Sequence, residues 1–517
     1  MLPPVTALTV TSWLAELVAG RGPATAVVTP GGELTFTDLE RRGARLAGGL
    51  HSLGVGRGDR VGVFLPNGAA GIELFFAMAR LGAVAIGVNT RYRADDLRHL
   101  LDVSQATVLV SAVDFLGIDF EGIVAEATAP MGAPPHVVWP DELHALAAHE
   151  PYESDDAVPD DLVVAFTTSG TTGRPKLAAH DHASLVRHIG IAARSFGVSP
   201  DDTGLLAVPL CGTFGLISVL TMFAGGARVV VPDRFEPAAA AALMAAHRVT
   251  HLNASDDMLI GMINAARAAG LDLRAWREGV FAEFTNQGRA AVDAGDTVGA
   301  RLTGVYGSSE TYAFLAHRRA DEPAEARARN GGTLVDEAMA VRTADPVTGE
   351  VTAPGEQGEL QFSGPSVLRQ HLGNPEATAN AFTADRWMRT GDVGICDPDG
   401  QSFVYLARLG DALRLAGFLT DPVEIERRLL LHPQVHAAQV VGVAGPGGGD
   451  VAVAFVVAGD EVPTETQLIA HCAAGLANYK VPRRVMLVAA FPTVDGANGV
   501  KIRKSELRSM ASQLMVQ

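Results

Sequence analysis

The chain has 517 residues, which is enough for more than one domain with its own core. Its hydrophobic share of 48% beside 19% charged residues describes a folded protein rather than a disordered one. The net charge of −17 argues against nucleic acid as the main partner, because a phosphate backbone needs a basic face. Three widely separated cysteines (Cys211, Cys396 and Cys472) suggest neither a disulfide framework nor a zinc site.

The beginning of the chain lacks a basic segment followed by an apolar one, and no run of 18 apolar residues occurs anywhere. We therefore expect no signal peptide and no membrane span, and a reducing, cytoplasmic setting. Short apolar strands at 60–65 and 83–88 flank a helix through Phe75 and Met78. Such alternation predicts an α/β fold with a largely parallel sheet covered on both faces. Residues 119–160, rich in Ala, Pro, Asp and Glu, are expected to form a surface excursion.

Residues 167–176 read TTSGTTGRPK and follow the apolar, β-prone run LVVAF at 162–166. Glycines allow a tight backbone bend, in which free N–H groups and hydroxyls converge on an anion. Arg174 and Lys176 add positive charge, so a polyphosphate is the natural ligand. The spacing is not that of the GxxxxGK[ST] loop. Taken alone, the segment is also typical of a polar surface turn.

Several later motifs lie where strands give way to turns or helices. Residues 304–310 read GVYGSSE, and a helix is expected from 180 to 196 before the strand 205–210. The motifs that follow are GELQFSGP at 358–365, RTGDVG at 389–394, YLARLGDALRLAGFLTDPVEIE at 405–426 and FPTVDGANGVKIRK at 491–504.

In order and spacing these motifs resemble those of the adenylate-forming superfamily, which includes acyl-CoA synthetases, peptide-synthetase adenylation domains and firefly-type luciferases. The resemblance covers nearly the whole chain and is greatest with the AMP-forming acyl-CoA synthetases. It implies a large N-terminal AMP-binding domain (1–409) of packed α/β subdomains with mostly parallel sheets. A small, mobile α+β C-terminal domain (410–517) would follow, with the hinge near Gly410. A glycine changes its backbone angles at little cost, as a hinge requires.

The resemblance implies ATP, Mg²⁺ and coenzyme A as ligands. The residues it assigns to the nucleotide, its phosphates and the pantetheine arm are Thr167, Thr168, Ser169, Gly170, Thr171, Thr172, Lys176, Tyr306, Gly307, Ser308, Ser309, Asp392, Arg408 and Gly417. The Tyr306 ring suits stacking on a purine, and the Asp392 carboxylate offers two acceptors to the ribose hydroxyls. Glu310 is the expected magnesium ligand, since hard oxygen donors suit that ion.

Lys501 is expected to bind the substrate carboxylate and the α-phosphate, and with Glu310 and Thr168 it makes up the predicted catalytic set. Val500 separates this lysine from Gly499, an imperfect match to the family pattern. Lys504 is therefore the alternative.

The resemblance places the acyl pocket around Gly212, Thr213, Phe214, Asp256, Asp257 and Phe284. Gly212 stands where the family usually has histidine, and it either widens the pocket or simply starts a helix. Asp256 and Asp257 either bind a polar part of the substrate or cap a helix that begins near Met258. Residues 279–285 lack the glycines of the family's adenine-contacting turn, so that contact is not carried over.

The chain is therefore expected to activate a carboxylic acid with ATP and to form its CoA thioester, with fatty acid metabolism one setting. Medium or bulky hydrophobic acids are favoured, and aromatic and alicyclic acids stay open. One alternative is a stand-alone acyl-AMP ligase that loads a carrier-protein thiol. Another is a non-catalytic nucleotide-binding protein of the same fold. The residues leave a homodimer open.

Overall fold

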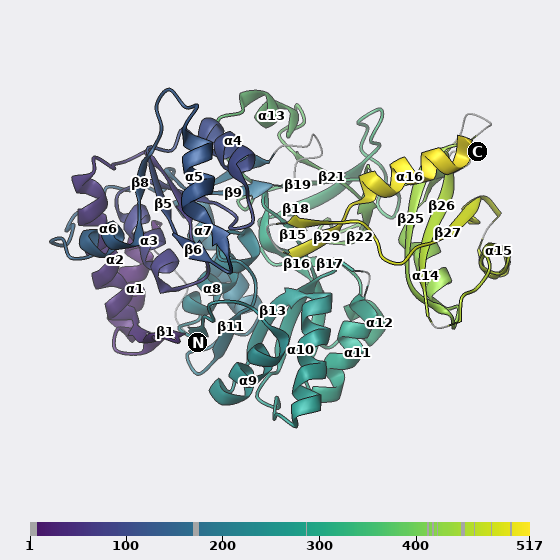
Figure 1. Cartoon of the computed structure of the whole chain (residues 1–517), viewed down its shortest axis with the longest axis horizontal. Helices are drawn as coiled ribbons and strands as arrows, with labels where there is room; N and C mark the ends of the chain where they lie inside the picture. Colours follow the sequence, from purple (N-terminus) through teal and green to yellow (C-terminus); the bar gives the residue numbers. More distant parts are fainter. Residues whose placement is uncertain are drawn as a thin grey trace.

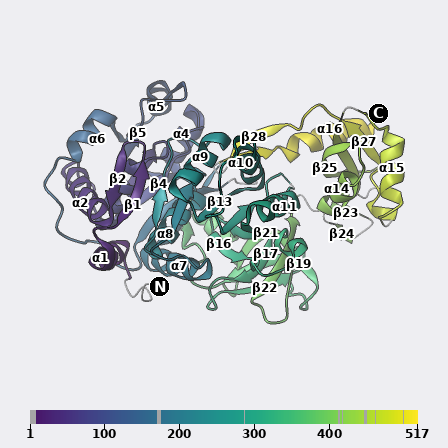
Figure 2. The same cartoon turned by 90° about the horizontal axis from the view of Figure 1, so that it is seen from below.

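The computed structural model describes residues 8–168, 175–285, 287–410, 413–415, 418–420, 422–445, 450–459, 461–476, 478–496 and 499–516. A large body built from the first four-fifths of the chain carries a small yellow-green lobe at one side (Figure 1). The view from below shows the same two parts (Figure 2).

A seven-stranded sheet of the large body contains the strand that precedes the predicted phosphate loop. Its order is β20-β10-β9-β4-β3-β5-β8. The apolar run LVVAF lies in β9, near the middle, and is buried, as expected for a strand covered on both faces. The strands are β3 (Arg60–Phe64), β4 (Val84–Gly87), β5 (Val108–Ser111), β8 (His136–Val138), β9 (Leu162–Thr168), β10 (Lys176–Asp181) and β20 (Gln370–His371).

A thirteen-stranded sheet in the order β18-β19-β21-β22-β17-β16-β15-β14-β13-β11-β12-β1-β2 forms the rest of the large body. It is parallel from β12 through β15 and antiparallel from β15 to β18. The strands are β1 (Thr25–Thr29), β2 (Gly32–Thr35), β11 (Thr203–Leu206), β12 (Arg228–Val230), β13 (His251–Ser255), β14 (Glu278–Ala282), β15 (Arg301–Ser308), β16 (Tyr312–His317), β17 (Gly331–Leu334), β18 (Ala340–Ala344), β19 (Gln357–Ser363), β21 (Met388–Cys396) and β22 (Ser402–Arg408).

Helices pack on these sheets, and α8 is the most deeply placed of those described, because all of its residues are buried. A helix that is apolar all round belongs in a core. The helices are α1 (Val10–Arg21), α2 (Phe36–Ser52), α3 (Ala69–Arg80), α4 (Ala94–Ser104), α5 (Phe120–Thr128), α6 (Pro140–Leu146), α7 (His182–Ser195), α8 (Thr213–Ala224), α9 (Pro237–His247), α10 (Asp256–Ala269), α11 (Gly288–Val298), α12 (Ala324–Arg327) and α13 (Pro375–Asn380). A two-stranded ribbon pairs β6 (Asp114–Phe115) with β7 (Ile118–Asp119).

The small lobe has a five-stranded sheet whose main path is β24-β23-β26-β25, with β27 paired to β26. A separate hairpin, β28–β29, extends from this lobe toward the large body in both views (Figures 1 and 2). The elements are β23 (Leu413–Leu415), β24 (Phe418–Thr420), α14 (Pro422–Leu430), β25 (Val435–Ala444), β26 (Asp450–Ala458), α15 (Glu465–Ala473), a 3₁₀ turn (Asn478–Lys480), β27 (Arg484–Leu487), β28 (Thr493–Gly496), β29 (Gly499–Ile502) and α16 (Lys504–Val516).

The predicted α/β class is confirmed, but three local expectations were wrong. Residues 119–160 contain α5, β8 and α6, and β8 extends the seven-stranded sheet through its pairing with β5. Helix α7 begins at His182, because His180 still pairs with Val164 in the sheet. The strand expected to reach 210 ends at Leu206, since the chain then turns through Pro209 to start α8.

Five of the described histidines of the large body are buried: His180, His182, His188, His251 and His371. Burial disfavours the charged imidazolium. It lowers the pKa of His180, His182 and His371 to about 4 and that of His188 to about 3.

The free energy of unfolding should therefore depend on pH between the lowered pKa values of these histidines and the ordinary histidine pKa of 6.5. In that range the unfolded chain binds protons that the folded chain does not, so the folded state becomes less stable as the pH falls. We expect the apparent Tm, measured calorimetrically at one scan rate, to be several degrees lower at pH 5.0 than at pH 7.5. His182→Gln should reduce this difference, because one titrating group is removed. An equal or higher Tm at pH 5.0 would contradict this explanation.

Candidate active site

The parallel strands of the large sheet end at one edge, and the predicted motifs meet there. The register pairs Leu206 with Asn253, Ser255 with Ala282, and Phe281 with Gly304. The segments that follow β11, β13, β14 and β15 are therefore neighbours, although up to 100 residues of sequence separate them. The carboxyl edge of parallel strands is where α/β proteins bind ligands.

The predicted phosphate loop connects β9 to β10 as a hairpin. Thr168 and Lys176 are directly opposite each other in the antiparallel register, so the two ends of the loop lie together. The imidazole of His99 lies 3.0 Å from the carbonyl of Pro175, just beside the loop. The residues predicted to bind polyphosphate within the loop, Ser169, Gly170, Thr171 and Thr172, lie outside the described residues.

The Ser309 hydroxyl joins three of the motifs. It donates a hydrogen bond to the carbonyl of Thr167 (3.0 Å), at the end of the phosphate-loop strand. It accepts one from the Thr213 hydroxyl (3.2 Å), at the first turn of α8. Thr213 is buried, so this contact is shielded from water. One hydroxyl thus fixes the phosphate strand and the N-terminus of α8 against the turn that carries Glu310.

The sequence GVYGSSE forms the end of β15 and a tight turn into β16. Gly307 is required there, because a Cβ would lie 2.3 Å from the carbonyl oxygen of Ala313. The backbone N–H of Glu310 donates to the Ser308 hydroxyl (3.2 Å). Its carbonyl accepts from the N–H of Leu368 (2.7 Å).

Glu310 is the group expected to bind magnesium. In the described part of the chain, no lysine, arginine or histidine pairs with its half-buried carboxylate. No cluster of three or more His, Cys, Asp or Glu with metal-binding geometry occurs among the described residues. Mg²⁺ commonly uses one or two carboxylates together with substrate phosphates, so a single free carboxylate beside a phosphate loop fits this ion.

Tyr306, Asp392 and Arg408 form a buried polar group at the same edge. Asp392 and Arg408 are opposite each other in the β21–β22 register, and their side chains are 2.7 Å apart. The Tyr306 hydroxyl donates to the other carboxylate oxygen at 2.6 Å. Burial raises the pKa of Asp392, whereas the adjacent carboxylate raises that of Arg408. We hold Asp392 to be ionised at neutral pH, because a guanidinium contacts it directly.

The Tyr306 ring is packed against Phe362, Phe403 and Tyr405 and is 7% exposed. Stacking on a purine stays a prediction for this ring.

The residues predicted to line the acyl pocket are differently exposed. Gly212 is the residue before α8, and Phe214 is buried with its ring edge-on to Phe314. The fully buried carboxylate of Asp256 accepts from the backbone N–H groups of Phe284 (3.1 Å) and Thr285 (3.2 Å).

Helix α10 begins at Asp256 rather than near Met258, with Ser255 as its N-cap residue. Asp256 anchors the segment at 284–287, and so it does not cap α10 as the sequence suggested. Asp257 is exposed and accepts from the Ser255 hydroxyl at 2.5 Å. A substrate role for either carboxylate stays a prediction.

In the small lobe, the two candidate lysines are placed differently. Lys501 lies in β29, opposite Val494, in the hairpin that extends toward the large body. The Lys504 ammonium lies 3.8 Å from the carboxylate of Glu426, which is fully buried and accepts from the Val440 N–H. Lys504 therefore has a structural partner within its own lobe.

At the predicted hinge, the Gly410 carbonyl accepts from the Arg508 guanidinium (2.6 Å), and its Cα faces open space. Gly417, predicted to approach the pantetheine arm, lies outside the described residues.

Two contacting residues were not among the predicted site residues. The Tyr92 side chain hydrogen-bonds to that of Thr167, and burial raises the pKa of Tyr92 to about 12. His180 contacts the carbonyl of Ser309 at 2.7 Å. Tyr92 ends the segment RLGAVAIGVNTRY, and a tyrosine soon after an apolar strand was the available signal. His180 had no comparable signal, because its partner is 129 residues away.

Comparison with known proteins agrees with this geometry. Residues 14–372 match the model of the AMP-binding enzyme family, and residues 424–495 match that of the AMP-binding enzyme C-terminal domain. The chain is 32% identical to a feruloyl-CoA synthase from Amycolatopsis sp., over 96% of this chain and 98% of that protein. It is 30% identical to 4-coumarate–CoA ligase 3 from Oryza sativa subsp. japonica, over 93% and 87%. Among solved structures, ATP-bound MatB from Rhodopseudomonas palustris superimposes with a TM-score of 0.87 at 25% identity, covering 98% of this chain and 99% of that one.

The chain belongs to the AMP-binding enzyme family. The fold and site thus define an AMP-forming acid–CoA ligase, and the class, fold and activity predicted from the sequence are confirmed. None of the described helices is long and apolar enough to span a membrane.

The Ser309 contacts give a direct test of the site. Ser309→Ala removes both hydrogen bonds and should lower kcat/KM for ATP about tenfold to a hundredfold, because two partners lose their positions. Ser309→Thr keeps the hydroxyl and should retain activity within about threefold. Steady-state pyrophosphate release measures both variants. Equal activity of the alanine variant and the wild type would show that the hydroxyl does not organise the site.

Proposed function

We propose that this chain activates an aromatic carboxylic acid as its acyl-adenylate and transfers the acyl group to coenzyme A. The observation that carries the proposal is the Ser309 hydroxyl, which fixes the phosphate-loop strand, the N-terminus of α8 and the Glu310 turn at one sheet edge. These are the parts needed to hold a triphosphate, an acid and a metal ion around one phosphorus atom.

In the first step, a carboxylate oxygen of the acid attacks the α-phosphorus of ATP. The bond from that phosphorus to the bridging oxygen breaks, and pyrophosphate leaves with the electron pair. Crowded negative charge is the main barrier, so positioning and charge neutralisation are the main contributions of the protein. Mg²⁺, held by Glu310, would neutralise phosphate charge when bound.

The chain's own groups hold the reactants in this step. Thr168 and Lys176 lie at the two ends of the phosphate loop. Asp392, whose two oxygens accept from Arg408 and Tyr306, would also accept from the ribose hydroxyls. Lys501 contributes positive charge between the acid and the α-phosphate. In the second step the thiol sulfur attacks the acyl carbon, AMP leaves, and the thiol proton is lost. Rotation near Gly410 would remove Lys501 and bring the small lobe's other face to the thiol.

The class of acid is proposed from the relatives and the pocket. The similar proteins named above are a feruloyl-CoA synthase and a 4-coumarate–CoA ligase, both named for hydroxycinnamic acids. Gly212, before α8, brings no side chain next to the Thr213–Ser309 pair. An aromatic acid is consistent with these features.

The acid and the acceptor can be tested together. We expect pyrophosphate release with hydroxycinnamic and benzoic acids at a kcat/KM at least tenfold above that with octanoic acid, and a CoA ester as the product. Acid-dependent pyrophosphate release without a CoA ester would instead indicate transfer to a carrier-protein thiol. ATP binding without release for any acid would indicate a non-catalytic nucleotide-binding protein. Light scattering on the same sample would show whether the chain forms a homodimer.

The two lysines can be separated by half-reaction. Lys501→Ala should slow pyrophosphate release about a hundredfold or more, while thioester formation from supplied acyl-AMP stays within about threefold, because only the first step needs its charge. Lys504→Ala is the matched control. It should lower the Tm, since it removes a cation that lies 3.8 Å from the fully buried Glu426 carboxylate, and leave pyrophosphate release per folded molecule nearly unchanged. The reverse pattern would assign activation of the acid to Lys504.

A further inference from the structure

Tyr312, two residues after Glu310, has an unusual backbone conformation. Its φ is +62°, in the left-handed region that bulky residues seldom adopt. Tyr312 is also fully buried and is the first residue of β16. A strained backbone that persists is held by its surroundings, and such strain is concentrated at functional sites.

Two imidazole rings hold the Tyr312 side chain from either face. The His180 ring is 4.1 Å away at an interplanar angle of 27°, and the His188 ring is 4.6 Å away at 26°. All three side chains are fully buried. The Tyr312 hydroxyl also lies 2.9 Å from that of Ser184. The stack fixes the ring and, through it, the end of the turn that begins at Ser308.

The His180 ring also contacts the beginning of that turn. Its Nε2 lies 2.7 Å from the carbonyl oxygen of Ser309, the residue before Glu310. Since a carbonyl can only accept, Nε2 carries the proton and donates it. The other nitrogen, Nδ1, is buried without a hydrogen-bond partner. One neutral imidazole therefore holds both sides of Glu310, by a hydrogen bond before it and by ring stacking after it.

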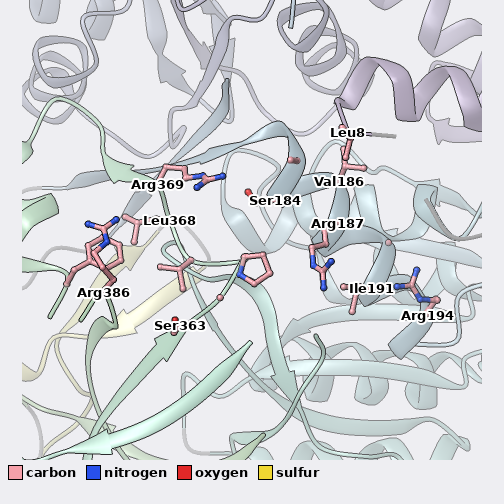
Figure 3. A pocket seen from close by; sticks show the side chains of 16 residues that line it. Leu8, Ser184, Val186, Arg187, Ile191, Arg194, Ser363, Leu368, Arg369 and Arg386 are labelled. Atoms are coloured by element: carbon pink, nitrogen blue, oxygen red, sulfur yellow. The ribbon is translucent and has the colours of Figure 1, made fainter. Parts of the chain in front are cut away.

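Two residues that bond to this turn also border a cavity. Ser184 and Leu368, which bond to Tyr312 and to the Glu310 carbonyl, line a cavity of about 510 Å³ between α7 and the segment 363–369 (Figure 3). Their hydrogen bonds therefore help to define the position of the turn on the side that faces the cavity.

We propose that His180 is a positioning residue that sets the geometry of Glu310 for its metal ion, with Tyr312 and His188 completing the stack. This inference rests on the proposed function, in which Glu310 binds Mg²⁺ beside the ATP phosphates. His180 itself touches neither ATP nor the acid.

The test compares the affinity for ATP with and without magnesium, measured by isothermal titration calorimetry in 5 mM MgCl₂ and in EDTA. The Kd ratio between the two conditions reports the metal site and does not depend on turnover. His180→Leu should reduce this ratio about tenfold, whereas His180→Gln, which keeps a side-chain N–H, should remain within about threefold of the wild type. Tyr312→Gly relieves the backbone strain but removes the stack, and it should also reduce the ratio.

His182→Gln is the matched control, because His182 is equally buried but bonds to the N–H of Val10 instead of the turn. It should leave the Kd ratio unchanged, even if its Tm falls as much as that of His180→Leu. An unchanged ratio in both His180→Leu and Tyr312→Gly would overturn the proposal, as would an equal change in His182→Gln. Glu310→Ala tests the proposed metal ligand separately from the proposed role of His180. If this variant leaves the Kd ratio unchanged, Glu310 does not bind the metal ion.

Discussion

The structure of the active site depends on a hydroxyl group that belongs to neither the phosphate loop nor the acyl pocket. Ser309 donates to Thr167 and accepts from Thr213, so it connects the seven-stranded sheet, the central helix α8 and the thirteen-stranded sheet. His180 of the seven-stranded sheet adds a second polar contact, to the Ser309 carbonyl, whereas the apolar side chains between the sheets tolerate small shifts. A hydrogen bond between fixed groups tolerates much less, because its strength falls steeply with distance and angle.

The motifs were found from the sequence through their resemblance to the family, and some of them also have a local cause. A buried apolar strand followed by glycines and hydroxyls predicts a phosphate loop, and Gly307 is required by the close approach of the Ala313 carbonyl. The parallel α/β class likewise follows from alternation of strands and helices. These features depend on neighbours in sequence, and so they were accessible without a structure.

Other features depend on contacts between distant segments. Residues 119–160 were taken for a surface excursion because their Ala, Pro, Asp and Glu content lacks clear apolar periodicity, yet β8 is held by its partner β5. Asp256 was expected to cap a helix, but the loop after β14 supplies four donors to its carboxylate, and capping α10 would need the same oxygens. His180 meets Ser309 only because β10 and β15 end at the same place. In each case the fold topology, and not the neighbouring sequence, determines which residue is the contact partner.

The site thus combines groups fixed in the large body with a lysine carried by the small lobe. The large body holds its polar groups by burial: Asp392 is fixed by Tyr306 and Arg408, and the turn after Ser309 is fixed by neutral histidines. Because these buried histidines stay uncharged in the folded chain, the protein loses stability at acidic pH. Leucine at the same positions would not titrate and would not cause this loss. The small lobe is connected through Gly410, whose Cα faces open space, and the hairpin with Lys501 extends from it. In the proposed two-step reaction, the nucleotide would stay in place on the large body while Lys501 is exchanged for the thiol.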